Sequence, residues 1–472
     1  MAPAFSSLLP SSLQLYPSRG EAQHRWIGIW LGCFGIVTLG SAWIWRLRFR
    51  LGQTIAGSRT SDNESIEAIK KRYGLSDHGF MPTKEEMQEP LPAYCRQWEE
   101  TAARLPELIA NKQIHAEVDA WTGVPSSVLH EWEPFSPKLR RAYAVLSVVA
   151  QAYVWAEPEN PKQMLPRSLA IPLVSTSCQL GLPPIMAHAA SDLWNWQPAA
   201  ATADFAQIEG YETRFSLTGT IDEEWFFSSS RACQWIAGPL VVRSYDVLAS
   251  AAPRDDMRSV GKFLVDLASC LSAMTIQLTR LTEKCGADVF WTQLRPLLRG
   301  SEGNEDKLPK GLCFEEVNQL GTGEVLAGAS AAQSSAIPVF DAVLGVQHRE
   351  GDRDFLLKMR EYMPGRHRKY IELLEGKESL RQALERWRDG GKAGTAQLIQ
   401  DYDTALDKLL AFRKGHWKIV GTHILAKVAQ EQKTSTGSED VSAAMGTGGS
   451  SIEGFLLGTA RSVSASKLAV KQ

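Results

Sequence analysis

Several features that are typical of common functional classes are missing from this 472-residue sequence. Its 51 Lys and Arg residues are balanced by 53 Asp and Glu residues, so it lacks the basic excess of a nucleic-acid-binding protein. Its seven cysteines are scattered and include no Cys-x-x-Cys pair, which argues against a disulfide framework and a thiolate zinc site. The Gly-x-Ser-x-Gly, His-Glu-x-x-His and calcium-loop patterns are also absent. We therefore expect no nucleic-acid partner and none of these hydrolytic or metal-dependent chemistries.

Patterns typical of β-strands are nearly absent, whereas apolar residues recur at helical spacing along most of the chain. The strongest helical patterns cover residues 257–284, 354–374, 379–388 and 395–428. A chain of this length exceeds one ordinary hydrophobic core, so two packed domains are expected. The sequence predicts an all-α fold, with a small helical domain at residues 73–215 and a large helical bundle at residues 216–472.

The N-terminal region contains an uncharged stretch that is long enough to span a membrane. Residues 26–45 carry no formal charge over 20 residues, and a helix rising about 1.5 Å per residue would cross the roughly 30 Å hydrocarbon core. Tryptophans lie near both ends of the stretch, and three arginines follow it at once, which places the C-terminal part in the cytosol. We therefore predict an N-terminal segment (1–25), a transmembrane anchor (26–45) and a flexible linker (46–72).

Other interpretations of the N-terminus stay open at this point. A cleaved signal peptide would also be apolar, although residues 26–45 are long for one and begin late. The first 25 residues are Ser-rich and poor in acidic residues, which is typical of a mitochondrial address. A third alternative is a soluble cytoplasmic protein whose true N-terminus lies further along the chain.

One histidine lies on the apolar stripe of the helical pattern at residues 395–428. His416 shares this stripe with five aliphatic side chains, and Arg413 lies one turn before it. A neutral imidazole facing an apolar cavity suits haem iron, and an arginine on the same face can bind a propionate. A lone histidine on an apolar helix face is more often a hydrogen-bonded core residue, and His423 is an equal candidate by periodicity. Spacing alone does not decide among these alternatives.

Two stretches of small residues lie near the C-terminus. The small-residue run, residues 328–332, would let the backbone approach a flat ligand closely, although a flexible turn between helices is the simpler interpretation. Residues 446–450, Gly-Thr-Gly-Gly-Ser, lack the preceding strand and the lysine of a phosphate-binding loop. Nucleotide binding is therefore not expected.

These stretches occur in a fixed order together with many shorter motifs. The matching motifs are at residues 91–92, 105–106, 152–155, 165–167, 182–185, 195–196, 226–230, 268–271, 290–295, 326–335, 340–341, 363–368, 412–416 and 446–450. Over about residues 73–468 the chain resembles the indoleamine 2,3-dioxygenase family. The resemblance implies an all-helical enzyme that holds haem b and cleaves the indole C2–C3 bond of L-tryptophan, or of a related indoleamine, with O2. The product would be N-formylkynurenine, in the first step of the kynurenine pathway toward NAD, and an electron donor would keep the iron ferrous.

The resemblance also implies roles for individual residues. His416 would be the proximal ligand of the haem iron, and the other cofactor contacts would be Arg413, Asp341, Ala329 and Ser330. Ser230 and Arg295 would be the residues at the site of reaction, with Arg295 binding the substrate carboxylate. The remaining substrate contacts would be Phe290, which packs on the indole, Thr447 on a mobile loop, and Ser330 with Ala331.

Five residues depart from the pattern of this family. Trp291 stands where a phenylalanine is usual, and Ala329 stands where a glycine is usual. His188, Ser191 and Asp192 occupy the inner pocket where mammalian members have Tyr, Cys and Val. An acidic side chain against an indole is costly unless it faces water or finds a hydrogen-bond donor. A haem-binding sensor or regulatory protein with little turnover is therefore the alternative function.

Overall fold

The computed structural model describes residues 64–317, 323–434, 446–447 and 452–468. The N-terminal segment, the predicted membrane anchor at 26–45 and most of the predicted linker lie outside these residues. The described residues all belong to one compact unit that extends from Gly52 to Gln472. The predicted domain boundary between residues 215 and 216 stays a prediction.

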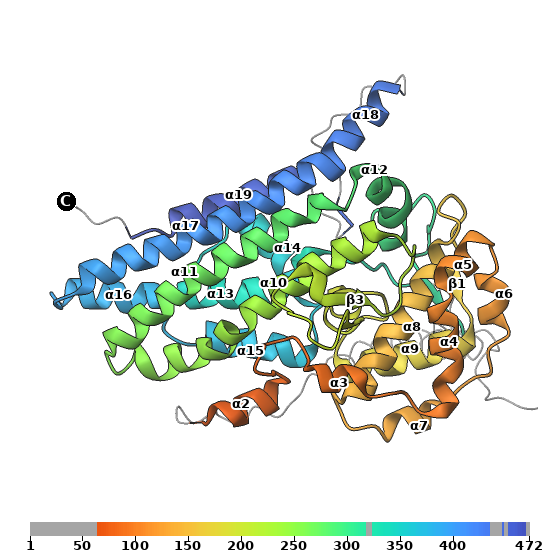
Figure 1. The fold of residues 1–472 in the computed structure, drawn as a ribbon, viewed down its shortest axis with the longest axis horizontal. Helices are drawn as coiled ribbons and strands as arrows, with labels where there is room; N and C mark the ends of the chain where they lie inside the picture. Colours follow the sequence, from red (N-terminus) through yellow and green to blue (C-terminus); the bar gives the residue numbers. More distant parts are fainter. Residues whose placement is uncertain (1–63, 318–322, 435–445, 448–451, 469–472) are drawn as a thin grey trace, which may run out of the picture. The chain divides into compact units, whose positions relative to one another are not determined.

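The fold is predominantly helical, as the sequence predicts, and its strands are very short (Figure 1). Helices of the N-terminal part are α2 (Ile66–Tyr73), α3 (Lys84–Gln88), η1 (Ala93–Cys95), α4 (Arg96–Ala103), α5 (Leu105–Ala110), α6 (Ile114–Asp119), α7 (Ser126–His130), α8 (Pro137–Trp155), α9 (Arg167–Leu180), η2 (Ala189–Leu193) and η3 (Ile208–Gly210). Strand β1 (Met164–Leu165) pairs in parallel with β4 (Cys313–Phe314), and β2 (Trp196–Pro198) pairs antiparallel with β3 (Tyr211–Thr213).

Helix α2 shows that the predicted linker, residues 46–72, is wrong at its C-terminal end. The hydroxyl of Ser65 caps this helix by accepting a hydrogen bond from the backbone N–H of Ala68 at 3.3 Å. Gly74 ends the helix with a φ of 68°, a conformation that glycine adopts without steric strain. Ile69 and Tyr73 are buried, so the helix packs on the core.

The remaining helices form the larger part of the molecule. They are α10 (Ile221–Asp246), η4 (Val247–Ala251), α11 (Met257–Thr279), η5 (Arg280–Glu283), α12 (Ala287–Val289), η6 (Phe290–Leu294), η7 (Arg295–Leu298), η8 (Ala331–Gln333), α13 (Ala336–Leu344), α14 (Glu350–Arg360), α15 (Gly365–Glu375), α16 (Leu380–Asp389), α17 (Thr395–Val420), η9 (Gly421–Leu425), α18 (Ala426–Thr434) and α19 (Ile452–Ala465). The long helices α10, α11 and α17 pack side by side, with α13 against α10 and α19 against α17 (Figure 1).

Helix α11 and the turn after it are strongly apolar. Within the described residues, Met257–Glu283 is the one helical stretch that is long and apolar enough to cross a membrane. Its stripe of Leu264, Leu267 and Leu271 is fully buried in the protein core. The opposite face includes Val265 and Ile276, which are exposed.

The single helix predicted over residues 354–374 is wrong. The structure has two helices, α14 and α15, separated by a turn at residues 361–364. Pro364 explains the break, because a proline disfavours the helical conformation of the residue before it. The helix predicted over residues 395–428 is confirmed, although it passes through the π-helical segment η9 before it continues as α18.

Within the part of the chain that the structure describes, four segments adopt the rare π-helical form, namely η2, η4, η6 and η9. Such turns cluster at functional sites because the extra residue redirects the side chains of a helix. Three of the four carry side chains that line one cavity: Ser191 and Asp192 in η2, Phe290 in η6, and His423 and Ile424 in η9.

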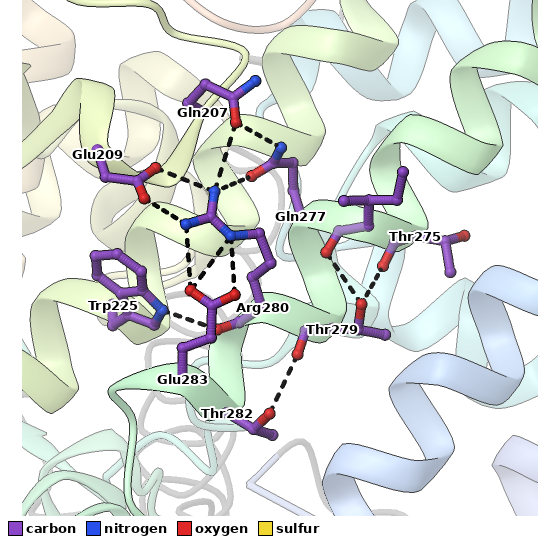
Figure 2. Close-up of polar contacts among 10 residues, drawn as sticks. Gln207, Glu209, Trp225, Thr275, Gln277, Thr279, Arg280, Thr282 and Glu283 are labelled. Carbon is purple, nitrogen blue, oxygen red and sulfur yellow. Dashed lines mark hydrogen bonds and ion pairs between the residues drawn. The ribbon is translucent and has the colours of Figure 1, made fainter.

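The C-terminal end of α11 is fixed by the guanidinium group of Arg280 (Figure 2). This group pairs with Glu283 at 3.1 Å, and it also pairs with Glu209. The backbone carbonyl of Arg280 accepts a hydrogen bond from the indole N–H of Trp225 in α10 at 2.8 Å. These contacts join α10, η3 and η5 beside Leu278 and Leu281, which line the cavity.

Candidate functional site

The helices enclose a cavity of about 900 Å³. This volume lies near the upper end of the roughly 300–1,000 Å³ range of ligand pockets. The cavity is lined by all ten residues predicted to bind cofactor or substrate: Ser230, Phe290, Arg295, Ala329, Ser330, Ala331, Asp341, Arg413, His416 and Thr447. The fold therefore brings together side chains that are more than 200 positions apart in the sequence, while their chemical roles remain predictions.

His416 projects from α17 into the wall of this cavity. Among the described residues, no side chain or backbone group forms a hydrogen bond with its ring. Burial and the nearby Arg413 lower the pKa of His416 to about 4, so the imidazole is neutral at neutral pH. A neutral ring without a hydrogen-bond partner can donate a nitrogen lone pair to a metal ion.

His423, the alternative candidate, also lines the cavity, but both of its ring nitrogens are engaged. Nε2 lies 2.9 Å from the carbonyl oxygen of Cys285, and Nδ1 lies 2.9 Å from the hydroxyl of Thr422. The side chain is 5% exposed. The hydrogen-bonded core interpretation therefore fits His423, and the ligand interpretation fits His416.

A buried ion pair lies beside His416. Nη2 of Arg413 donates to both carboxylate oxygens of Asp341, at 2.7 and 2.9 Å. Nε2 of His348 lies 3.0 Å from the same carboxylate. Burial acts to raise the pKa of Asp341, but Arg413 and His348 together hold it below its usual value. His348 was not predicted, because its position in a turn after α13 carries no periodic signal.

The small-residue run packs closely against neighbouring backbone, and its last two residues begin the short helix η8. A Cβ atom at Gly328 would lie 2.2 Å from the carbonyl oxygen of Leu298, so only glycine fits this position. The backbone N–H of Ala327 donates to the hydroxyl of Tyr362 at 2.8 Å. Ser330 caps the short helix η8 through its hydroxyl group. These contacts place the run at the cavity wall in close contact with neighbouring backbone.

Thr447 contacts this run directly. Its hydroxyl donates to the carbonyl oxygen of Ala329 at 2.6 Å, and its own carbonyl accepts from the N–H of Gly328 at 2.8 Å. Of the predicted loop at residues 446–450, only Gly446 and Thr447 are described. These two hydrogen bonds hold the threonine at the edge of the cavity.

Another part of the wall combines aromatic rings with a cation. Phe290 is 6% exposed, and its ring centre lies 5.1 Å from that of Phe226. The guanidinium carbon of Arg295 lies 4.5 Å from the ring centre of Trp291, whose N–H donates to Glu431 at 2.6 Å. Burial, with Arg299 nearby, lowers the pKa of Arg295 to about 10, which leaves it charged at neutral pH. Trp291 therefore packs against the cation that is expected to bind a carboxylate.

A polar corner, defined here as His188, Ser191, Asp192, Ser230 and Gln234, completes the lining. The hydroxyl of Ser191 donates to Oδ2 of Asp192 at 2.6 Å, and Nδ1 of His188 lies 3.2 Å from the same oxygen. The amide nitrogen of Gln234 lies 3.3 Å from Nε2 of His188. Burial acts to raise the pKa of Asp192, but its contacts with His188, Ser191 and Ser230 hold it below the usual value. Hydrogen-bond donors therefore offset the free-energy cost of burying the carboxylate of Asp192.

The donor set fits a haem group on the His416 side of the cavity. The buried Nε of Arg413 has no hydrogen-bond partner among the described residues, so it can donate to a propionate. Apolar side chains that could pack on a porphyrin include Leu278, Leu281, Ile419, Val420 and Ile424. Across the described ranges, no three His, Cys, Asp or Glu side chains gather as ligands for a metal ion.

Fold and site together define a class of protein: an all-helical protein with a histidine-walled cavity suited to a flat cofactor. A family model described as indoleamine 2,3-dioxygenase matches residues 69–464. The chain therefore belongs to the indoleamine 2,3-dioxygenase family, whose enzymes are oxidoreductases.

Individual relatives agree with this assignment. The chain is 32% identical to indoleamine 2,3-dioxygenase acdA of Aspergillus candidus, over 83% of the chain and 95% of the relative. It is 30% identical to indoleamine 2,3-dioxygenase 1 of Rattus norvegicus, over 84% of the chain and 96% of the relative. A third relative, 29% identical over 80% of the chain and 92% of its own length, is 6-hydroxytryptophan 2,3-dioxygenase fscD of Fusarium equiseti.

Proposed function

We propose that this protein is a haem-dependent dioxygenase that cleaves the indole C2–C3 bond of L-tryptophan, or of a closely related indole amino acid, to the N-formylkynurenine product. The observation that carries the proposal is the neutral imidazole of His416, which lines a cavity of about 900 Å³ without a hydrogen-bond partner among the described residues. Haem, when bound, would supply the redox-active iron centre at which O2 is used.

The chain's own residues would bind and orient the reactants. His416 would hold the iron, while Arg413 would hold a propionate. The guanidinium of Arg295 would bind the substrate carboxylate, for which its planar fork of N–H donors is suited. Phe290 and Phe226 would provide an apolar slot for the indole ring. The hydroxyl of Thr447, held by Ala329, would close the edge of the site.

Two observations bear on the substrate. The relatives include both tryptophan-type indoleamine dioxygenases and a 6-hydroxytryptophan dioxygenase, so the family accepts more than one indole. The apolar slot at Phe290 suits any indole ring, and the cation at Arg295 suits any amino acid that keeps its carboxylate. We therefore assign the substrate class as an α-amino acid with an indole side chain.

Turnover by the purified haem-loaded protein tests this proposal. With a reductant and 18O2, L-tryptophan should give a product with the absorbance of N-formylkynurenine and with two 18O atoms by mass spectrometry. A protein that binds haem but forms no such product from any indole amino acid would instead support the haem-sensor alternative.

We also propose that residues 26–45 anchor this enzyme on a membrane with its catalytic part in the cytosol. The support is the sequence alone: an uncharged stretch of 20 residues followed by three arginines. Carbonate extraction of cell membranes should leave the full-length protein in the pellet. Release into the supernatant would contradict the anchor, and protection from added protease in intact organelles would contradict its orientation.

A further inference from the structure

The polar corner carries more hydrogen-bonding side chains than an unsubstituted indole ring can use. Asp192 is 5% exposed and His188 is 4% exposed, yet both line the cavity. They come from one turn of chain, with Asp192 inside the π-helical segment η2, and Gln234 reaches them from α10. An unsubstituted indole ring would leave such groups facing hydrocarbon, which is unfavourable for buried polar atoms.

A second layer of hydrogen bonds holds the corner in place. The buried guanidinium of Arg231 donates to the backbone carbonyl of Ser191 at 2.9 Å, and its charge acts on Asp192. Gln234 donates to the hydroxyl of Ser334 at 2.6 Å. The backbone N–H of His188 donates to the side chain of Gln333 at 3.0 Å. The side chains of the corner are therefore preorganised rather than free to turn away from a ligand.

The carboxylate of Asp192 retains capacity for one more donor. The contacts from Ser191 and His188 both use its Oδ2 atom, and Ser230 supplies a third hydrogen bond. A carboxylate offers about four lone-pair sites, so one acceptor site remains for a donor inside the cavity. The charge of Arg231 acts on both Glu224 and Asp192, and with this cation already nearby a neutral O–H group suits the site better than a second cation.

We propose that the polar corner selects indole amino acids that carry a hydroxyl group on the benzo ring. The substrate hydroxyl donates its proton in a hydrogen bond to Asp192, and the imidazole of His188 orients that carboxylate. This inference rests on the proposed function, because it names the substrate class of the same cavity. It makes Asp192 a specificity-determining residue and His188 a positioning residue.

Binding measurements with matched ligands test the inference. The ligands are the 5- and 6-hydroxy-L-tryptophans and the 5- and 6-methyl-L-tryptophans, whose substituents are similar in size. Isothermal titration calorimetry on the ferric haem protein gives the dissociation constant of each. A hydrogen bond to a charged acceptor corresponds to a preference of roughly 10- to 100-fold for hydroxyl over methyl at one of the two positions.

Variants identify the group that causes the preference. In Asp192→Asn the hydroxyl-to-methyl ratio should fall to within about threefold of unity, because the charged acceptor is gone. Asp222→Asn is the matched control, since this buried aspartate lies outside the cavity and bonds to the N–H of Gly286. The control should keep the wild-type ratio. His188→Phe should reduce the ratio less than Asp192→Asn does, and His188→Asn should partly restore it.

Two outcomes would contradict the inference, and a third would separate it from the proposed function. Equal binding of hydroxyl and methyl ligands by the wild type would refute it, even if L-tryptophan is turned over. If Asp192→Asn weakened L-tryptophan and all analogues equally but left indole-3-propionate unchanged, the corner would hold the substrate ammonium instead. Conversely, Asp192-dependent binding of a hydroxytryptophan without any turnover would support the inference and reject the proposed dioxygenase activity.

Discussion

Replacing Asp341 with asparagine tests the buried ion pair beside His416. The side chains of Asp341 and Arg413 are each 11% exposed and are joined by hydrogen bonds of 2.7 and 2.9 Å. Asparagine preserves the volume but removes the charge, and this leaves the guanidinium of Arg413 without its counter-ion. Breaking a buried pair in this way costs about 3–5 kcal/mol. We expect the free energy of unfolding to fall by about 3 kcal/mol, at the low end of this range, because the amide oxygen of asparagine can still accept one hydrogen bond.

Urea unfolding of the haem-free protein, followed by circular dichroism, measures this loss. A double-mutant cycle with Arg413→Met isolates the pair: the double variant should be hardly less stable than Asp341→Asn alone. Asp389→Asn is the control, because Asp389 forms an exposed pair with Arg388 and its loss should leave the unfolding midpoint unchanged. If the two single effects added to within about 0.5 kcal/mol in the double variant, the reasoning about the pair would be wrong.

The same pair predicts how stability depends on pH. Arg413 and His348 lower the folded-state pKa of Asp341, so the unfolded chain takes up a proton at this residue first as the pH falls. The stabilisation is therefore complete above the unfolded-state pKa of about 3.9 and is lost as the pH falls through the folded-state value. The stability difference between the wild type and Asp341→Asn should be constant near neutral pH and should shrink below about pH 4.

Two further predictions concern the substrate end of the cavity. Arg295→Ala should keep the haem but lose on the order of 30-fold or more in kcat/KM for L-tryptophan. The kcat/KM for tryptamine, which has no carboxylate, should fall far less. Equal losses for both substrates would exclude a carboxylate role. Thr447→Val removes the hydrogen bond to Ala329. Loss of a hydrogen bond worth roughly 1 kcal/mol corresponds to a rise of about fivefold in the KM for L-tryptophan. An unchanged KM would show that this contact does not shape the site.

Much of the site could be predicted because it depends on residue identity within ordered motifs. His416, Arg413 and Asp341 are separated by up to 75 positions, yet all line one cavity as expected. The helical patterns at residues 257–284 and 395–428 also held, as α11 and α17 show. The choice between His416 and His423 could not be made by periodicity, because only tertiary contacts show that Cys285 and Thr422 occupy the ring of His423.

Other features have no signal in the sequence. The break at Pro364 was missed because the apolar periodicity continues on both sides of it, and α2 was missed because its apolar stripe is short. The π-helical segments insert one residue without changing composition, so the placement of Asp192 toward the cavity could not be foreseen. Arg231, which supports Asp192, has a charge typical of a surface residue and yet is fully buried.

The central claim is that His416 holds a haem in this cavity, and the absorption spectrum of two histidine variants tests it most directly. Wild-type protein, His416→Ala and His423→Ala are purified and titrated with haemin under the same conditions. The account predicts that His423→Ala retains a wild-type Soret band and a stoichiometry of one haem per chain, whereas His416→Ala loses both. Retention of the band in His416→Ala, with its loss in His423→Ala, would contradict the assignment of the ligand.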